Sequence, residues 1–292
     1  MADVRIIPHV DTPYPLGRHI EHDDESRGYA FKAARAVTPT SVRHLRHVSL
    51  WNQGDIGSCT GNASLGCIGT GGFYDTVRAL PIDWTEAGAV SVYTDATVID
   101  GIPGTYPAQD TGSTGIAVAK VLKSRGYISG YQHTFSFNDL LAALQDRPVI
   151  VGVGWYNNFF YPDSNGVITI GNADYVAGGH EFILDEIDVE RQLIGATNSW
   201  GEEWGLRGRF YIPFAVMQRL LKEQGDCTVF VPLTQPAPEP APSDPTVVPE
   251  VTTVADQALW STVKDWSRAS HTGSNKSAAN AVKTWAAVKH LQ

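Results

Sequence analysis

The sequence predicts an α+β fold in which a helical part comes first and a run of strands follows. Helix-capable segments occupy residues 59–123, where small and apolar residues predominate. From residue 148 onward the pattern changes to short β-branched segments separated by turn residues. Because helices and strands are segregated along the chain, we expect a helical layer and an antiparallel sheet with a cleft between them.

Composition limits the function classes. The chain has 292 residues, enough for one domain of roughly 200–230 residues and an appendage. Its net charge of −9 argues against nucleic acid as a partner. No apolar run has the length of a signal peptide or a membrane span, so we expect a cytoplasmic or virion-associated protein. Three irregularly spaced cysteines argue against a disulfide framework, and we expect neither a metal nor a cofactor.

Residues 1–47 are predicted to form an N-terminal arm. Pro8, Pro13 and Pro15 exclude an early helix, and residues 26–37 have the composition of one short helix. Two interpretations remain open for the arm. It either packs on the main domain or acts as a pro-like inhibitory segment that occupies a cleft.

A helix is predicted from Cys59 to about Val77. Glycines weaken it, at a cost of about 1 kcal/mol each, and they make sense where another element packs very close. These glycines are Gly61, Gly66, Gly69, Gly71 and Gly72.

Two more helical segments follow. Asp83 with Glu86 three residues later is typical of an N-cap, which predicts a helix through Tyr93. Residues 99–115 are rich in Gly, Pro and Asp and predict a loop, and residues 116–123 predict a further helix. The predicted strands are 148–154, 167–170, 181–184, 193–197 and 208–212.

The C-terminal region is predicted to be a separate appendage to a main domain of residues 48–233. Residues 234–253 are rich in proline and predict an extended linker. Residues 254–292 have the pattern of a helical hairpin. Such a hairpin has too little core to be secure alone, so we expect it to dock on a protein partner or on the main domain.

The main chemical signal lies in Gln53-Gly-Asp-Ile-Gly-Ser-Cys59. A thiolate is stabilised at a helix N-terminus, where free N–H groups favour negative charge. Gln53 can direct an amide N–H to the same place. The pattern predicts a nucleophile with half of an oxyanion hole.

A base and its orienting group follow in the strand region. His180 comes directly after Gly178 and Gly179, although a single His before a strand is usually only a satisfied imidazole. Asn198 ends a strand, where its amide can hold the imidazole tautomer on a neighbouring strand. Trp200 and Trp204 are expected to shield that contact from water.

Together these blocks resemble the papain-like cysteine peptidases. The family's blocks are similar to Gln-Gly-Asp-Ile-Gly-Ser-Cys59, Gly-Gly-His180 and Asn198-Ser-Trp-Gly-Glu-Glu-Trp-Gly, in that order. The resemblance covers about residues 48–215 and implies the papain-like two-layer fold and hydrolysis of peptide bonds. It implies that Cys59 is the nucleophile, that His180 is general base and then acid, and that Asn198 orients the imidazole. Gln53 and the Cys59 N–H would form the oxyanion hole, and the thiol pKa would lie well below ~8.5.

Three positions depart from the family pattern. Ile56 stands where the family has a cysteine, which removes that disulfide and is similar to the disulfide-free bacterial and viral branch. Thr60 replaces the usual Trp. Glu181 follows the histidine, and three alternatives remain for it: raising the imidazolium pKa, reaching a substrate cation, or facing solvent.

Substrate contacts are predicted around the cleft. Asp110 and Gly112 are expected on the helical wall, and Trp155 either in an apolar subsite or in the core. Gly179, Glu181 and Trp200 complete the candidate substrate-binding residues. We expect a peptide or protein substrate bound in extended form, by strand-like pairing.

Three functions compete at this stage. The first is a cysteine endopeptidase. The second is a cell-wall peptidase or amidase whose Trp-containing tail targets it. The third is a non-enzymatic virion or scaffold component on a papain-like frame, against which the intact set of Gln53, Cys59, His180 and Asn198 argues.

Overall fold

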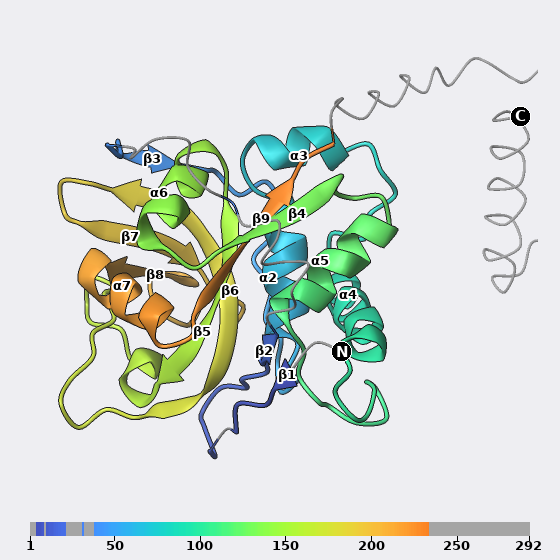
Figure 1. The fold of residues 1–292 in the computed structure, drawn as a ribbon, viewed down its shortest axis with the longest axis horizontal. Coiled ribbons are helices and arrows are strands. Elements are labelled where there is room, and N and C mark those ends of the chain that lie inside the picture. The colour runs from blue at the N-terminus through green and yellow to red at the C-terminus, as the bar shows by residue number, and fades with distance from the viewer. Residues whose placement is uncertain (1–3, 9, 22–30, 32–37, 234–292) are drawn as a thin grey trace, which may run out of the picture. The chain divides into compact units, whose positions relative to one another are not determined.

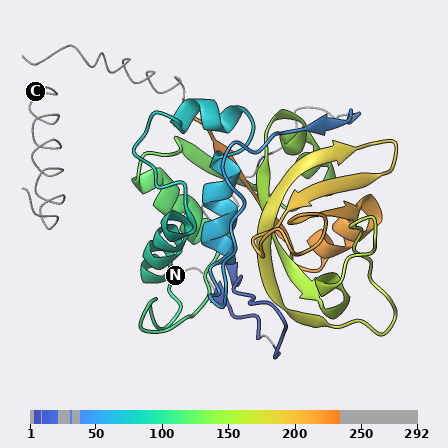
Figure 2. The same cartoon turned by 180° about the vertical axis from the view of Figure 1, so that it is seen from behind.

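The computed structural model describes residues 4–8, 10–21, 31 and 38–233. Figures 1 and 2 show, from opposite sides, helices on one side and a strongly curved sheet on the other, with α2 between them. The helical side contains α2 (Cys59–Ile68), α3 (Gly72–Val77), α4 (Glu86–Ile99) and α5 (Gly115–Ser124). The predicted α+β two-layer fold is confirmed.

The sheet is antiparallel throughout, in the order β4-β9-β5-β6-β7-β8, and β3 also pairs with β6. Its longest strand, β6, lies between β5, which precedes it in the chain, and β7, which follows it. The strands are β3 (Val42–Arg43), β4 (Gly130–Thr134), β5 (Val149–Tyr156), β6 (Val176–Asp188), β7 (Leu193–Thr197), β8 (Arg209–Pro213) and β9 (Asp226–Val231).

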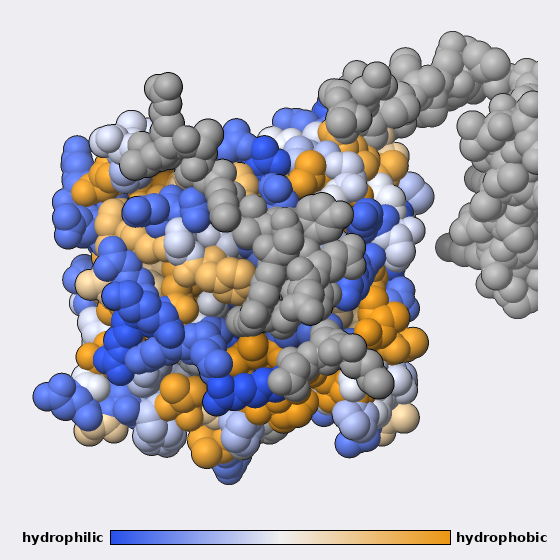
Figure 3. Space-filling model, in the orientation of Figure 1, coloured by the Kyte–Doolittle hydropathy of each residue, from blue (hydrophilic) through white to orange (hydrophobic). Residues whose placement is uncertain are grey.

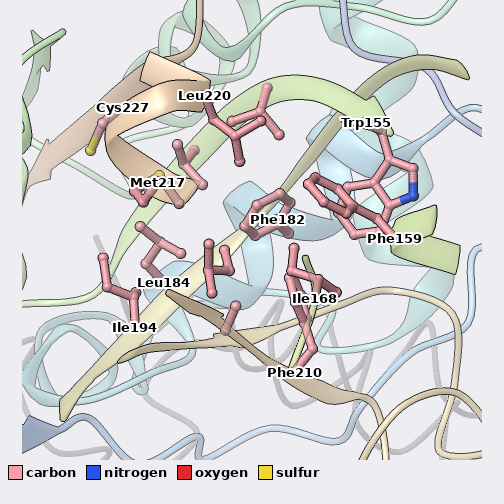
Figure 4. Packing of buried hydrophobic residues seen from close by; sticks show 14 of the residues in the cluster. Trp155, Phe159, Ile168, Phe182, Leu184, Ile194, Phe210, Met217, Leu220 and Cys227 are labelled. Carbon is pink, nitrogen blue, oxygen red and sulfur yellow. The ribbon is translucent and has the colours of Figure 1, made fainter. Parts of the chain in front are cut away.

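The two faces of the sheet bury two separate hydrophobic cores. Alternate residues of a strand point to opposite faces, so Phe182 and Leu184 of β6 join one core and Ile183 the other. The first core packs the sheet against α6 (Phe137–Asp146) and α7 (Phe214–Lys222), as Figure 4 shows around Phe182 and Met217. The second core joins the sheet to the helical layer.

Side-chain caps fix where three helices begin. Thr85, Thr114 and Ser136 each accept a hydrogen bond from a backbone N–H in the first turn of α4, α5 and α6. Such caps satisfy a helix N–H that has no partner within the helix. The predicted cap at Asp83 is wrong by two residues, because Asp83 instead accepts the hydroxyl hydrogen of Thr85.

The glycine-rich helix is where the prediction was partly wrong. It ends at Ile68, and α3 begins after Gly71, whose positive φ of 59° breaks the helix. The close packing that the glycines predicted is present. A Cβ at Gly61 would lie 2.4 Å from the Ala89 carbonyl oxygen of α4, and one at Gly66 would lie 2.8 Å from Ile183 of β6.

Other predicted boundaries differ modestly. The segment 167–170 is not a strand, since only Val167 forms an isolated bridge with Tyr211. The segment 181–184 is the middle of the longer β6, and 193–197 is β7 as predicted. The short helix η1 (Asn157–Phe160), α6, α7, β4 and β9 were not predicted.

An ion-pair network ties together the strands that carry the candidate site. The Arg209 guanidinium of β8 binds both carboxylate oxygens of Asp185 on β6 at 2.8 Å. It also donates to the Thr197 hydroxyl of β7 at 3.0 Å. Bidentate contacts of this kind fix geometry as well as charge, so β6, β7 and β8 are cross-linked just beyond His180 and Asn198.

The N-terminal arm forms a two-stranded hairpin, in which β1 (Val4–Arg5) pairs with β2 (Ile20–Glu21). The described chain between them, residues 6–8 and 10–19, lies against the main domain. The predictions for residues 234–253, a linker, and 254–292, a helical hairpin, fall outside the described residues. The predicted helix at 26–37 also lies outside them, except for residue 31. On the face in Figure 3, hydrophilic and hydrophobic residues alternate over short distances. Within the described ranges, no helix is long and apolar enough to cross a bilayer.

Candidate active site

Cys59 is the first residue of α2 and is fully buried. The backbone N–H groups of Thr60, of Glu181 on β6 and of Gly17 of the arm lie beside its sulfur, where they lower the thiol pKa. Glu181 directly follows His180 on β6, but His180 Nδ1 makes no hydrogen bond to the thiol. Burial outweighs the effect of these N–H groups and raises the pKa of the Cys59 thiol to about 12. The predicted low thiol pKa is therefore wrong for this covered state, in which the thiol is neutral.

The hydrogen bonds of Asn198 determine the tautomer of His180. Asn198 Oδ1 accepts the backbone N–H of Ser199 at 2.8 Å, which identifies that atom as the oxygen. The same oxygen lies 2.8 Å from His180 Nε2, so Nε2 must carry a hydrogen. His180 Nδ1 is buried and has no hydrogen-bond partner. A neutral imidazole with a bare Nδ1 can accept a proton.

Aromatic side chains enclose this imidazole. Trp200 stacks on it with ring centroids 4.5 Å apart, and Trp155 meets it edge-on at 4.8 Å. Trp204 lies behind Trp200 at 5.0 Å, so Trp200 gives the predicted shield and Trp204 supports it. Burial lowers the pKa of His180 to about 4, opposed by the Asn198 hydrogen bond. Trp155 is fully buried, which favours the core alternative over a subsite.

Gln53 lies at the turn before α2 and is almost fully buried. Its Oε1 accepts the Ser199 hydroxyl at 2.6 Å, and its Nε2 donates to the Ile56 carbonyl oxygen at 2.7 Å. An amide nitrogen carries two hydrogens, so one N–H remains to be directed elsewhere. These bonds connect the Gln53 turn to the loop after Asn198.

The arm crosses directly over Cys59. The N–H groups of Gly17 and Arg18 both donate to the Gly179 carbonyl oxygen, at 3.1 and 2.9 Å. On the other side, the Ser113 N–H donates to the Gly17 carbonyl at 2.7 Å, and Ser113 accepts from the His19 N–H at 2.8 Å. A Cβ at Gly17 would lie only 1.9 Å from the Gly57 carbonyl oxygen. The arm therefore lies between the two layers, in close contact with both.

The candidate substrate-binding residues divide into two groups. Gly112 and Gly179 border the arm, since a Cβ at either would lie within 2.4 Å of an arm carbonyl oxygen. Asp110 instead accepts the Gly57 N–H at 2.8 Å and the Tyr93 hydroxyl, which holds the turn before Cys59. Beside the arm a cavity of about 690 Å³ remains, lined by arm residues and by the turns containing Gly57 and Gly112.

Glu181 does not face solvent, so that alternative is wrong. Its side chain is fully buried, on the face of β6 opposite His180. The influences on the His180 pKa are burial and Asn198, which leaves no role for Glu181 there. Its carboxylate instead lies near Arg18 of the arm and Asp226 of β9.

Arg18 and Asp226 were missed from the sequence, whereas Ser113 belongs to the segment 110–113 that was expected on the cleft wall. Arg18 sits in a segment without a periodic pattern, and Asp226 begins a strand that was not predicted. The one available signal was the segment Gly112-Ser113 beside Asp110. This segment was expected on the cleft wall, but Ser113 was not identified as the residue whose backbone pairs with the arm. All three cysteines are free and buried, in agreement with the replacement at Ile56.

No protein-family profile and no curated protein matches this sequence. The structure, however, is similar to solved structures. It resembles xylellain, a cysteine protease from Xylella fastidiosa, with a TM-score of 0.59 and 19% identity, covering 77% of this chain and 98% of that one. It also resembles a structure from a study of the mite allergens Blo t 1 and Der p 1, with a TM-score of 0.50, 20% identity and coverage of 71% and 76%. The described part of the chain has the papain-like fold.

Proposed function

We propose that this protein is a cysteine peptidase that hydrolyses peptide bonds at Cys59. The observation that carries the proposal is the Asn198–His180 hydrogen bond, which leaves a bare imidazole Nδ1 one residue before Glu181, whose backbone N–H acts on Cys59 at a helix N-terminus. Such a set fits nucleophilic catalysis, in which a base activates the nucleophile and a third group orients the base. The cysteine-protease neighbours of the fold agree with it.

The chemistry follows from these positions. His180 Nδ1 takes the thiol proton, and the Cys59 sulfur attacks the carbonyl carbon. The resulting oxyanion is stabilised by the Cys59 N–H and the second N–H of Gln53 Nε2. The imidazolium then gives its proton to the leaving amine, which breaks the C–N bond and leaves a thioester. His180 next deprotonates a water, which hydrolyses the thioester and restores the thiol.

A polypeptide is the substrate class that the cleft accommodates best. The arm already lies there in extended form, with backbone hydrogen bonds to Ser113 and Gly179 on opposite walls. Backbone pairing of this kind binds any peptide, whereas side-chain pockets supply the selectivity.

We further propose that residues 1–47 act as a pro-like segment that keeps the enzyme latent. Gly17 covers the Cys59 sulfur, and both titrating groups of the pair are held uncharged. Displacing the arm would admit water and let the thiolate–imidazolium pair form.

The test uses the full chain with Gly17→Ala, since a methyl group cannot fit against Gly57. We expect Gly17→Ala to cleave a denatured protein, and wild type and Gly72→Ala to cleave it much more slowly. Gly72 is the matched control because a Cβ there meets nothing within 4 Å. Adding Cys59→Ser should abolish cleavage.

Two outcomes contradict the proposal. If folded Gly17→Ala cleaves no protein and its Cys59 does not react with an epoxide-type thiol inhibitor, the scaffold interpretation replaces the enzyme. If it releases peptides only from purified cell wall, the cell-wall peptidase interpretation replaces the endopeptidase.

A further inference from the structure

The Arg18 side chain of the arm enters a buried pocket in the floor of the cleft. It is 1% exposed although it belongs to a segment that lies across the surface of the domain. Its Nη2 donates to the Asp226 carboxylate and, at 3.3 Å, to the Gln224 carbonyl oxygen. Gly152 of β5 makes room for the guanidinium, because a Cβ there would lie 2.4 Å from Arg18 Nε.

Glu181 supplies a second acid to the same pocket. A Cβ at Gly152 would lie 2.7 Å from its Oε2, and one at Gly115 of α5 would lie 2.8 Å from its Oε1. Both carboxylate oxygens are buried and have no hydrogen-bond partner. Burial and the charge of Asp226 raise the pKa of Glu181 to about 8, and the Arg18 charge opposes this. Two acids, Glu181 and Asp226, therefore lie near the Arg18 guanidinium.

The pocket opens one residue away from the reactive sulfur. Gly17 contacts Cys59, and Arg18 follows it, with its backbone paired to Ser113 on one wall and Gly179 on the other. A substrate that pairs with the same two walls would place one of its side chains in this pocket. Removing the arm would take the Arg18 guanidinium away from the buried Asp226 carboxylate, which is unfavourable unless another cation replaces it.

We propose that Glu181, Asp226, Gly115 and Gly152 form a specificity pocket for a basic side chain of the substrate, and that Arg18 fills it as an internal mimic. This inference rests on the proposed peptidase function. Arginine should be preferred over lysine, because the Nη2 of its guanidinium reaches both the Asp226 carboxylate and the Gln224 carbonyl from one position. A neutral residue would not replace the Arg18 charge beside Asp226.

The test profiles hydrolysis by full-length Gly17→Ala with a peptide library varied at each position near the cleaved bond. At one position we expect arginine to exceed leucine by roughly 30-fold or more in kcat/KM, as is typical of a buried charge pair. Asp226→Asn should reduce that ratio at least tenfold, and Glu181→Gln should reduce it less, because the raised pKa of about 8 leaves Glu181 largely uncharged near neutral pH. Asp146→Asn makes the same charge change on an exposed side chain and should leave the ratio unchanged.

A second measurement does not depend on cleavage. Synthetic peptides with the sequence of residues 13–20 should inhibit Gly17→Ala, and replacing their arginine by citrulline or methionine should weaken inhibition at least tenfold. This difference should disappear in Asp226→Asn. Because the readout is a ratio within one enzyme preparation, partial misfolding of a variant cannot imitate the expected result.

The outcomes separate this inference from the peptidase proposal. An active Gly17→Ala that cleaves without a basic preference, and that binds arginine and citrulline peptides equally, overturns the pocket but leaves the peptidase standing. A Gly17→Ala that cleaves nothing and does not label at Cys59 overturns the peptidase proposal itself. Loss of the arginine preference in Asp146→Asn would also contradict the pocket.

Discussion

His180 and Glu181 are neighbours on β6, both fully buried, yet their surroundings are opposite. His180 faces Trp155 and Trp200, with one amide to hold it. Glu181 faces a cation and another acid. Burial lowers the pKa of the base to about 4 and raises that of the acid to about 8, so it opposes the charged form of each.

The difference teaches how one strand can serve two purposes. Because side chains alternate across a sheet, β6 directs the proposed base to one face and the acid of the proposed specificity pocket to the other. The His180 face should control the rate of bond breaking, and the Glu181 face should control which peptide is bound. Each change below is made in full-length Gly17→Ala and measured on arginine and leucine peptides, so that rate and preference can be separated.

The largest effect is expected from His180→Ala. Without a base, kcat should fall by roughly 10⁴-fold or more, equally for arginine and leucine peptides. His47→Ala is the control, since His47 is exposed and lies outside the cleft. A fall of less than about tenfold would mean that another group is the base.

Gln53→Ala should come next. Losing one oxyanion donor costs about 10²–10³ in kcat, and the arginine preference should stay the same. Because Gln53 also binds Ile56 and Ser199, thermal unfolding must be measured in parallel. Asn52→Ala, a change at an exposed neighbour, should alter kcat by less than about threefold. A large fall in kcat for Asn52→Ala would mean that the loss in Gln53→Ala comes from disturbing the turn, and not from removing an oxyanion donor.

Trp200→Phe should have an intermediate effect. For this variant the His180 pKa is followed with Gly17 intact, because the value of about 4 belongs to the site covered by the arm. The smaller ring admits water to the imidazole, so the pKa should rise toward 6.5. NMR titration of labelled histidine measures this shift, and kcat should change by about tenfold or less. Trp84→Phe, in the helical layer, should leave the His180 pKa unchanged. An unchanged pKa in Trp200→Phe would refute the shielding role.

The smallest effect is expected for a change in α2, on which the His180 face and the Glu181 face of β6 both depend. Gly61→Ala places a methyl group 2.4 Å from the Ala89 carbonyl oxygen, so overpacking should lower the free energy of unfolding by about 1–3 kcal/mol. Gly72→Ala has free space and should be neutral or stabilising by up to about 1 kcal/mol. Denaturant unfolding compares the two. Equal stabilities would contradict the close α2–α4 packing.

The fold class could be predicted from the sequence, because the α+β fold follows from segregated periodicities. Cys59, His180 and Asn198 could be proposed as catalytic because each lies in a local pattern of glycines, tryptophans and strand ends. The β7 boundaries were predicted because a short β-branched segment between turn residues has few alternatives.

The missed features depend on contacts between distant segments. Nothing local distinguishes Arg18 or Asp226, which meet across 208 positions of the chain. The low thiol pKa of Cys59 was predicted from the helix N-terminus alone. The arm buries the sulfur, and burial raises this pKa instead of lowering it. The helix break at Gly71 likewise depends on a backbone φ that glycine permits but does not require.

The most direct test is the pH dependence of Cys59 alkylation in wild type and Gly17→Ala, followed by intact mass. In wild type the thiol pKa of about 12 predicts slow labelling that rises about tenfold per pH unit through the neutral range. In Gly17→Ala we predict labelling at least 100-fold faster at pH 7, with a plateau across neutral pH that His180→Ala removes. Identical slow profiles in both folded proteins would contradict a latent Cys59–His180 pair.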